Sequence, residues 1–300
     1  MRSGCAALIG RPNVGKSTLL NRLLGQKIAI VSPKPQTTRT RILGVVTAAA
    51  GQVGFYDTPG MFAERAPWRK SMLSSALVAI RECDLILFLT EAHQGNSFQL
   101  NVDERFVLEN LQSMAQPVVL VITKIDTVKK PSLLPFIDFY RQQFPFVEVV
   151  PISARYAEGM TEFFDVVLGC MPVRNPLFPA DFLTDQTERV LVAEYVREQV
   201  FRYCQQEIPY STTVVVESFD ETKRHVPAAL GTGSKRRLSG LVRIHASIFV
   251  ERDSQKAILI GEKGQMLKKI GTASRESIKQ LLDCHVFLSL QVVCGKSGRK

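Results

Sequence analysis

The 300-residue sequence predicts an α/β protein in two parts, a doubly wound, mostly parallel sheet followed by a smaller α+β domain. The chain is long for a single hydrophobic core. Strand-like and helix-like segments alternate over the first 170 residues, which is typical of a parallel sheet with helices on both faces. Pro172, Pro176 and Pro179 then interrupt this pattern. We therefore expect domains at 1–170 and 185–300, joined by a linker at 171–184.

Six short runs rich in Val, Ile and Leu predict the strands of the first domain. Their nearly continuous apolarity is typical of strands that are covered on both faces. The second and third runs are separated by only a short Ala/Gly turn, which predicts an antiparallel hairpin. The expected strands are 5–9, 42–47, 53–56, 85–89, 118–122 and 147–150, and the expected helices are 16–24, 69–80, 98–113, 132–143 and 159–168.

The second domain has fewer elements and more basic residues. A Gly-rich stretch with several Lys and Arg residues at 223–240 predicts a mobile basic loop. The run Ile258-Leu259-Ile260 is interpreted as a short strand that leads into a glycine turn. The other expected elements are a helix at 185–204, strands at 213–218 and 242–250, helices from 265 and at 273–282, and a final strand at 286–293.

Composition excludes an integral membrane protein and points to a polyanion partner. The longest apolar runs are far shorter than the roughly 18 residues of a membrane span. Six cysteines without a C-x-x-C pair favour a reducing cytoplasm, and a first strand near Cys5 leaves no expected signal peptide. The net charge is +10, and residues 221–300 alone hold 16 basic and 6 acidic residues. This positive charge favours binding to nucleic acid or to an anionic membrane over the alternative of a basic surface that only contacts solvent.

A phosphate-binding motif lies between the first expected strand and the first expected helix. The glycines allow successive backbone amides to point inward, and the positive end of the helix adds to the resulting nest. Lys16 would reach the β- and γ-phosphates, and the Ser17 hydroxyl would ligate Mg²⁺. A chance glycine-rich turn is the weaker alternative in this setting. The pattern G-x-x-x-x-G-K-[ST] occupies Gly10, Arg11, Pro12, Asn13, Val14, Gly15, Lys16 and Ser17.

Two later motifs follow strand ends, as the rest of a nucleotide site should. Asp57-Thr58-Pro59-Gly60 could hold Mg²⁺ through Asp57 and meet a γ-phosphate with the Gly60 amide, although the same residues also suit a turn. In Thr123-Lys124-Ile125-Asp126 the Asp126 carboxylate could accept two hydrogen bonds from guanine, which adenine cannot donate. A helix N-cap is the alternative role of Asp126. Ser153-Ala154 would bring a backbone amide to the guanine oxygen.

These motifs and their order resemble the Era family of translation-factor-related GTPases over nearly the whole chain. Further similar segments are Pro-Gln-Thr-Thr-Arg at 35–39, Pro-Ile-Ser-Ala at 151–154 and Phe-Pro-Ala-Asp-Phe-Leu-Thr-Asp at 178–185. The resemblance implies a P-loop GTPase domain at 1–170 and a type II KH domain at 185–300. It also implies GTP/GDP and Mg²⁺ as cofactors, with K⁺ as a further candidate held beside the phosphates by Asn13.

The resemblance assigns roles that the bare pattern does not. Thr38 would ligate Mg²⁺ and order the segment 26–40 in the GTP state, so that Ser17, Thr38 and Asp57 hold the metal. Met61 stands where many GTPases carry a water-orienting glutamine, so we expect slow turnover that rests on Lys16, Thr38 and Gly60, without a general base. The nucleotide-binding set is then Gly10, Arg11, Pro12, Asn13, Val14, Gly15, Lys16, Ser17, Thr18, Asp57, Thr58, Pro59, Gly60, Met61, Thr123, Lys124, Asp126, Ser153 and Ala154.

Position 123 departs from the family, which usually has Asn there. A threonine hydroxyl offers one donor, whereas an amide offers two donors and an acceptor. We expect guanine specificity to persist through Asp126, with somewhat weaker nucleotide affinity.

The glycine turn near the C-terminus is the candidate RNA site. A G-x-x-G turn beside a helix lets backbone approach single-stranded nucleotides closely, as in KH domains, although a plain turn has the same pattern. The basic balance of this end favours RNA binding. The expected contacts are Gly261, Glu262, Lys263, Gly264, Lys268 and Lys269.

The Era resemblance implies that this turn binds the 3′ region of small-subunit (16S) ribosomal RNA during small-subunit assembly, with GTP favouring the RNA-competent state. We expect a monomeric cytoplasmic protein. Two alternatives stay open: a nucleic-acid binder with a degenerate nucleotide site, and a basic end that contacts the inner face of the cell membrane.

Overall fold

A computed structural model describes residues 1–34, 37–60, 80–95, 98–224 and 240–295. Within these residues the chain divides into two compact units, Met1–Gln186 and Thr187–Lys300, each described here by itself. The expected helix at 69–80, Met61, most of the expected basic loop and the final five residues lie largely or wholly outside the described residues.

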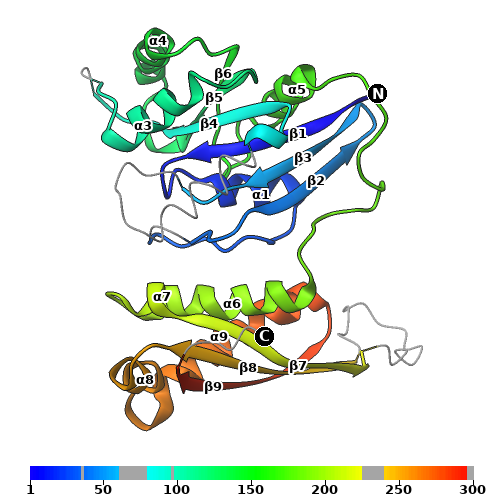
Figure 1. Cartoon of the computed structure of the whole chain (residues 1–300), viewed down its shortest axis with the longest axis vertical. Helices are drawn as coiled ribbons and strands as arrows, with labels where there is room; N and C mark the ends of the chain where they lie inside the picture. The colour runs from blue at the N-terminus through cyan, green and yellow to red at the C-terminus, as the bar shows by residue number, and fades with distance from the viewer. Residues whose placement is uncertain (35–36, 61–79, 96–97, 225–239, 296–300) are drawn as a thin grey trace. The chain divides into compact units, whose positions relative to one another are not determined.

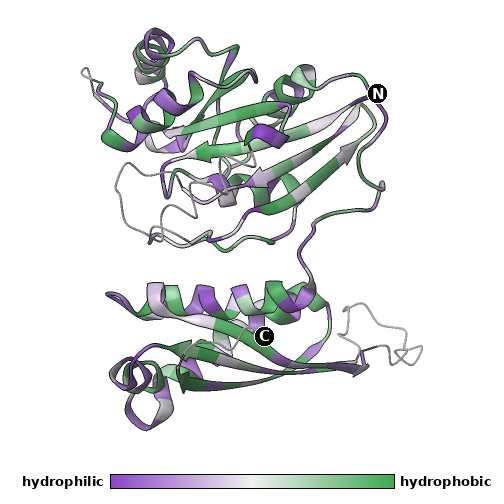
Figure 2. Ribbon diagram, viewed as in Figure 1, coloured by the Kyte–Doolittle hydropathy of each residue, from purple (hydrophilic) through white to green (hydrophobic). Residues whose placement is uncertain are grey.

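The first unit is built on a six-stranded sheet in the order β2-β3-β1-β4-β5-β6 (Figure 1). All neighbours pair in parallel except β2 and β3, which form the predicted antiparallel hairpin. The central strands β4 and β5 are buried except for Glu91 at the end of β4, which explains their nearly continuous apolarity (Figure 2). The strands are β1 Arg2–Gly10, β2 Ile42–Ala48, β3 Gly51–Asp57, β4 Leu85–Glu91, β5 Val118–Thr123 and β6 Glu148–Pro151.

Helices cover both faces of this sheet, as predicted. One face of β1 packs with α3 (Val102–Leu111) and α4 (Leu133–Gln143) around Phe88 and Phe136. The other face carries α1 (Lys16–Leu24) and α5 (Met160–Cys170), and Phe163 of α5 stacks on Phe55 of β3. The parallel strands thus present their carboxyl ends at one edge, where ligands bind in such folds.

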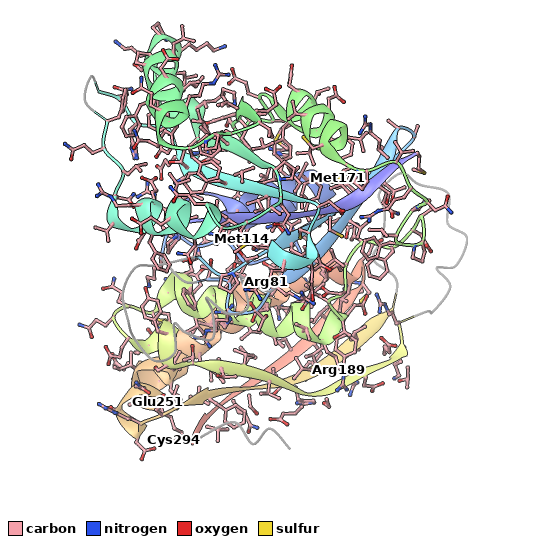
Figure 3. The ribbon with its side chains drawn as sticks, turned by 45° about the horizontal axis from the view of Figure 1, so that its top comes forward. Arg81, Met114, Met171, Arg189, Glu251 and Cys294 are labelled. Atoms are coloured by element: carbon pink, nitrogen blue, oxygen red, sulfur yellow. The ribbon has the colours of Figure 1, made fainter. Side chains whose placement is uncertain are left out.

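The segment expected as a linker is hydrogen-bonded to the first unit. The Val45 amide of β2 donates to the Leu183 carbonyl at 2.8 Å, and Thr184 Oγ1 donates to the Leu43 carbonyl at 2.7 Å. Just after α5, the chain returns to β1, where a side chain at Gly4 would collide with Met171 (labelled in Figure 3). The boundary between the two units therefore falls after Gln186, because the expected linker is hydrogen-bonded to the first sheet.

The second unit has a three-stranded sheet in the order β7-β8-β9, with helices packed on it (Figure 1). β7 and β8 are antiparallel, whereas β8 and β9 are parallel. Arg189 near the start of α6 lies 5.9 Å from the ring centroid of Phe219 in β7 (Figure 3). The elements are α6 Glu188–Tyr203, α7 Ile208–Ser211, β7 Thr213–Lys223, β8 Leu241–Val250, α8 Asp253–Ile260, α9 Gln265–Leu282 and β9 His285–Cys294.

Two predictions in this unit were wrong. The run Ile258–Ile260 is not a strand but the last turn of α8, which begins after Arg252, and the Gln255 side chain accepts from the Arg252 amide. The helices expected from 265 and at 273–282 are one continuous helix, because Gly271 is accommodated inside α9. A three-residue apolar run carries no usable period, and a lone glycine is a weak helix breaker. An order of helix, two strands, two helices and strand is observed, with the short α7 added, but its two helices are α8 and α9 in place of the two that were expected.

The opposite burial of two adjacent residues at the end of α8 makes a prediction. Leu259 is fully buried, whereas Ile258 is 51% exposed. Leu259→Ala should lower the free energy of unfolding by about 2–5 kcal/mol. The matched control Ile258→Ala should stay within about 0.5 kcal/mol. Urea unfolding followed by circular dichroism measures both, and equal losses at the two positions would contradict this difference in burial.

Candidate functional site

A cavity of about 660 Å³ lies at the carboxyl ends of the first unit's strands. It gathers most of the predicted phosphate-, metal- and base-binding residues from loops that are far apart in the sequence. Its lining is Pro12, Asn13, Gly15, Lys16, Ser17, Thr18, Ile30, Val31, Ser32, Pro33, Thr37, Thr38, Gly60, Thr123, Lys124, Asp126, Thr127, Ala154 and Arg155.

The phosphate loop connects β1 to α1 and holds Lys16 in a buried position. The Lys16 ammonium donates to the carbonyls of Gly10 at 3.2 Å and Arg11 at 3.0 Å. Gly15 precedes the helix with φ 106°, a conformation that favours glycine. The loop therefore curls around its own lysine, and the ammonium is directed to the place where an anion would lie.

Burial disfavours the charged forms of Lys16 and Asp57. Burial lowers the pKa of Lys16 to about 8, against an opposing effect of the nearby Asp57 carboxylate. Burial likewise raises the pKa of Asp57, while Lys16, Ser17 and Thr38 act in the opposite direction. An isolated buried charge is costly, so the lysine is poised to gain from a bound polyanion.

Three oxygens converge beside the lysine. Ser17 Oγ donates to Asp57 Oδ2 at 2.6 Å, Thr38 Oγ1 lies 3.1 Å from the same oxygen, and the two hydroxyls are 3.0 Å apart. Neighbouring ligands of an octahedral Mg²⁺ are about 2.9 Å apart, given Mg–O distances of 2.0–2.1 Å. Asp57 Oδ1 is buried without a hydrogen-bond partner among the described residues. The donor set and this orphaned oxygen fit a hard divalent cation.

The base side of the cavity is organised around Asp126. Ser153 Oγ donates to Asp126 Oδ1 at 2.6 Å, which fixes the orientation of the carboxylate. Lys124, with φ 55°, begins the short 3-10 turn Ile125–Thr127 and lines the cavity. These residues follow β5 and β6, so strand pairing brings two motifs that are 27 positions apart into contact.

Thr123 links this base loop to the phosphate loop. Its hydroxyl lies 2.6 Å from the Val14 carbonyl and 3.0 Å from the Thr90 carbonyl. A hydroxyl has one proton and can donate to only one of the two at a time. The expectation of somewhat weaker nucleotide affinity than with Asn stays a prediction.

Several predicted residues act from outside the cavity. Thr58 Oγ1 donates to the Leu8 carbonyl at 2.8 Å, so its side chain braces the loop that carries Gly60. Val14 is buried in the core. The other described residues of the predicted set that do not line the cavity are Gly10, Arg11, Asp57, Pro59 and Ser153. Asn13 Nδ2 donates to the Pro33 carbonyl at 2.6 Å, which ties the phosphate loop to the segment before Thr38.

Sequence motifs did not single out Arg22. From α1 its guanidinium donates to the carbonyls of Ala154 at 2.6 Å and Arg155 at 2.5 Å, the loop expected to meet the guanine oxygen. Thr127 and Arg155 also line the cavity and were not predicted. Lone basic or hydroxyl residues outside a motif carry no signal that could have identified them.

The G-x-x-G turn of the second unit connects α8 to α9. Gly261, Lys263 and Gly264 have φ values of 70°, 48° and 77°. A side chain at Gly261 would crowd Met266, whereas one at Gly264 would point into open space. Open space beside Gly264 is what close approach of another backbone requires.

The two predicted lysines of α9 lie differently. Lys268 and Lys269 are both exposed, but the Lys269 ammonium lies 4.4 Å from the ring centroid of Tyr203 in α6. That cation–π contact holds Lys269 toward α6. Glu262 and Lys263 are exposed at the tip of the turn.

Comparisons with known proteins find matches for both units of the chain. A family model described as "50S ribosome-binding GTPase" matches residues 5–124, and one described as "KH domain" matches 207–296. GTPase Era of Geotalea uraniireducens is 48% identical over 98% of this chain and 93% of that protein. The chain belongs to the GTPase Era family. GTPase Era of Geobacter metallireducens is also 48% identical, over 97% of this chain and 92% of that protein.

Solved Era structures share the fold of the whole chain. One is Era in complex with MgGDPNP and nucleotides 1506–1542 of 16S ribosomal RNA, at 36% identity and TM-score 0.86, covering 98% of this chain and 94% of that one. Another is Aquifex aeolicus Era bound to GDP·AlF4⁻, at 37% identity and TM-score 0.85, covering 97% and 93%. The predicted P-loop GTPase and KH architecture is confirmed, and Era membership makes the protein a GTPase.

The lowered pKa of Lys16 predicts how nucleotide binding depends on pH. Only the protonated lysine attracts phosphate, so affinity for GDP should fall by up to about tenfold per pH unit above about pH 8. The folding stability of the nucleotide-free protein should depend on pH in the opposite direction. The unfolded chain keeps the Lys16 proton up to the ordinary pKa of 10.5, so this residue makes folding more favourable as pH rises between those values.

Calorimetry of GDP binding from pH 7.5 to 9.5 in two buffers of different ionisation enthalpy measures the proton uptake. Lys16→Arg is the matched control, because arginine stays charged over this range. Any titration of the guanine ring itself affects GDP binding to this variant and to the wild type equally. Identical pH slopes for the two proteins would show that Lys16 does not titrate as described.

Proposed function

We propose that this protein is a slow GTP-hydrolysing switch that binds the 3′ region of small-subunit (16S) ribosomal RNA through its second unit and serves small-subunit maturation. The observation that carries the nucleotide half is that Lys16, Ser17, Thr38 and Asp126 line one cavity, with the buried Asp57 hydrogen-bonded to Ser17 and Thr38 behind its wall. The RNA half is supported by the G-x-x-G geometry and by the solved Era complex with a 16S RNA segment.

The residue roles follow from the cavity. Lys16 and the amides of the phosphate loop neutralise the β- and γ-phosphates. Mg²⁺ supplies positive charge to the phosphate oxygens when bound, and Ser17, Thr38 and Asp57 are the residues that would hold it. Asp126 accepts from the guanine edge, while Ser153 keeps its carboxylate in place.

Hydrolysis in this site rests on positioning and charge. Gly60 lines the cavity, where its amide would meet the γ-phosphate, and no described residue at that end is suited to act as a general base. Met61, which lies outside the described residues, cannot orient water. Asn13 is the residue that would contribute an oxygen to K⁺, since its amide nitrogen is already engaged with Pro33. We therefore expect a low intrinsic rate.

A change of nucleotide state can reach the segment 26–40 through Thr38. Thr38 is buried and tied to Ser17 and Asp57 by its hydroxyl, so loss of the γ-phosphate and its metal would remove partners from this segment. An RNA-competent GTP state requires that the two states differ in RNA affinity.

The cellular setting is part of the proposal. Six free cysteines in the described residues suit a reducing cytoplasm. No helix within the described ranges is long and apolar enough to cross a membrane. We propose a cytoplasmic monomer, with peripheral contact of the basic end with the inner membrane as the competing use of that charge.

Hydrolysis tests the first half of the proposal. With Mg²⁺ present the protein should release phosphate slowly from GTP and not from ATP, and faster in potassium than in sodium salt. Lys16→Ala should abolish release, because the phosphate charge loses its fixed counter-charge. A phosphate-release assay with purified proteins measures both. Equal release from the two proteins would leave a nucleic-acid binder with a degenerate nucleotide site.

RNA binding tests the second half. Gly261→Asp with Gly264→Asp should weaken binding of a 16S 3′-terminal fragment by roughly tenfold or more, because carboxylates then face the phosphate backbone. The matched control Gln142→Asp with Gln143→Asp adds the same charge on the exposed end of α4. Filter binding at one fixed salt concentration measures the RNA affinities, and flotation with anionic liposomes is run in parallel. Loss of liposome binding with intact RNA binding would favour the membrane role.

A further inference from the structure

Glu91 is the last residue of β4, and it occupies a special place in the sheet. β4 lies between β1, which runs into the phosphate loop, and β5, which runs into the base loop. In the strand register Glu91 pairs with Thr123, directly before Lys124. Its side chain thus stands between the two loops that hold opposite ends of the nucleotide cavity.

One carboxylate oxygen of Glu91 contacts a cation from each loop. Lys124 Nζ lies 2.9 Å from Glu91 Oε2, and Arg11 NH2 lies 3.3 Å from the same oxygen. The Glu91 and Arg11 side chains are each 27% exposed, and that of Lys124 is 38% exposed. The three side chains are partly desolvated, so their attraction is screened less than that of a pair in open water.

The arginine is itself held from behind. Arg11 Nε lies 4.0 Å from Oε1 of the buried Glu104, whose carboxylate also accepts from Thr90 Oγ1 at 2.8 Å. Glu104 is further fixed as the third residue of α3, in a capping box with Asn101. Arg11 Nε makes no hydrogen bond at this distance, so Glu104 adds a charge behind Arg11, and the direct anchor of the Lys124 ammonium is Glu91 at the end of β4.

At the base end of the cavity, Lys124 is the long, flexible side chain that pairs with Glu91 among the residues that the structure describes. A lysine stem free in solvent samples many rotamers, and ordering it costs conformational entropy on binding. With its ammonium held at Glu91, the methylene stem is ordered before the purine arrives. Pre-ordered groups bind more tightly and release more slowly.

We propose that Glu91 is a positioning residue for the nucleotide: it holds Lys124 so that the lysine stem covers the purine, and it couples that stem to the phosphate loop through Arg11. This inference rests on the proposed function, in which the base lies against Lys124. An ordinary surface ion pair would have no such effect on bound nucleotide.

A double-mutant cycle on the full chain tests the coupling. Release of a fluorescent GDP analogue is followed by chasing with excess GDP for the wild type, Glu91→Gln, Lys124→Ala and the double variant. Glu91→Gln should release the analogue about three- to tenfold faster, and Lys124→Ala at least as much faster. Because Glu91 acts through Lys124, the double variant should release no faster than Lys124→Ala alone.

Two controls separate positioning from a structural role. Glu109→Gln, on the exposed face of α3, should leave the release rate unchanged. Glu91→Gln should keep the unfolding temperature of the nucleotide-free protein but reduce the increase that GDP produces. A purely structural carboxylate would lower the unfolding temperature in both states alike.

The outcomes are distinct. Independent, multiplicative effects of the two substitutions, or a normal release rate in Glu91→Gln beside a fast one in Lys124→Ala, would overturn the positioning role and leave the proposed function standing. A normal release rate in Lys124→Ala would instead overturn the placement of the base on Lys124, and the inference would fail with it.

Discussion

The site depends on two opposite charges that the fold has removed from water. Asp57 ends β3, and Lys16 begins α1 after the loop that follows the neighbouring strand β1. Burial lowers the pKa of Lys16 and raises that of Asp57, which disfavours the charged form of each. Keeping them charged is costly in the empty protein. A phosphate and a divalent cation provide opposite charges for Lys16 and Asp57. Binding therefore gains the electrostatic stabilisation that these two buried groups lack in the empty protein. The rest of the cavity serves to present that pair to a nucleotide.

Much of the nucleotide site could be predicted because the phosphate, metal and base motifs are each a short, uninterrupted stretch of sequence. Each follows an apolar strand, and parallel strands must end at a common edge. The residues that were missed obey no such local rule. Arg22 reaches across to a loop 132 positions away, and Glu91 gains its meaning only from the register of β4 with β5. Such contacts depend on the pairing of strands, which spacing along the chain does not encode.

The second unit shows the limits of pattern reasoning in another way. The glycine turn was found because left-handed backbone at Gly261 and Gly264 demands glycine. The flanking elements were harder, since Ile258–Ile260 is too short to show a helical period and Gly271 is tolerated within α9. In both cases tertiary packing determines the secondary structure. Leu259 of α8 and Ile270 of α9 are buried in the core of the second unit, and this burial stabilises the two helices that carry them.

The contacts of residues 183–185 with β2 have a consequence for solubility. β2 is the outermost strand of the first sheet, and its Val45 amide and Leu43 carbonyl would otherwise face outward as unpaired groups. Exposed strand edges recruit strands from other molecules and seed aggregation. The exiting chain covers this edge like a short extra strand. A fragment cut at residue 170 would lose that cover and would tend to self-associate through β2.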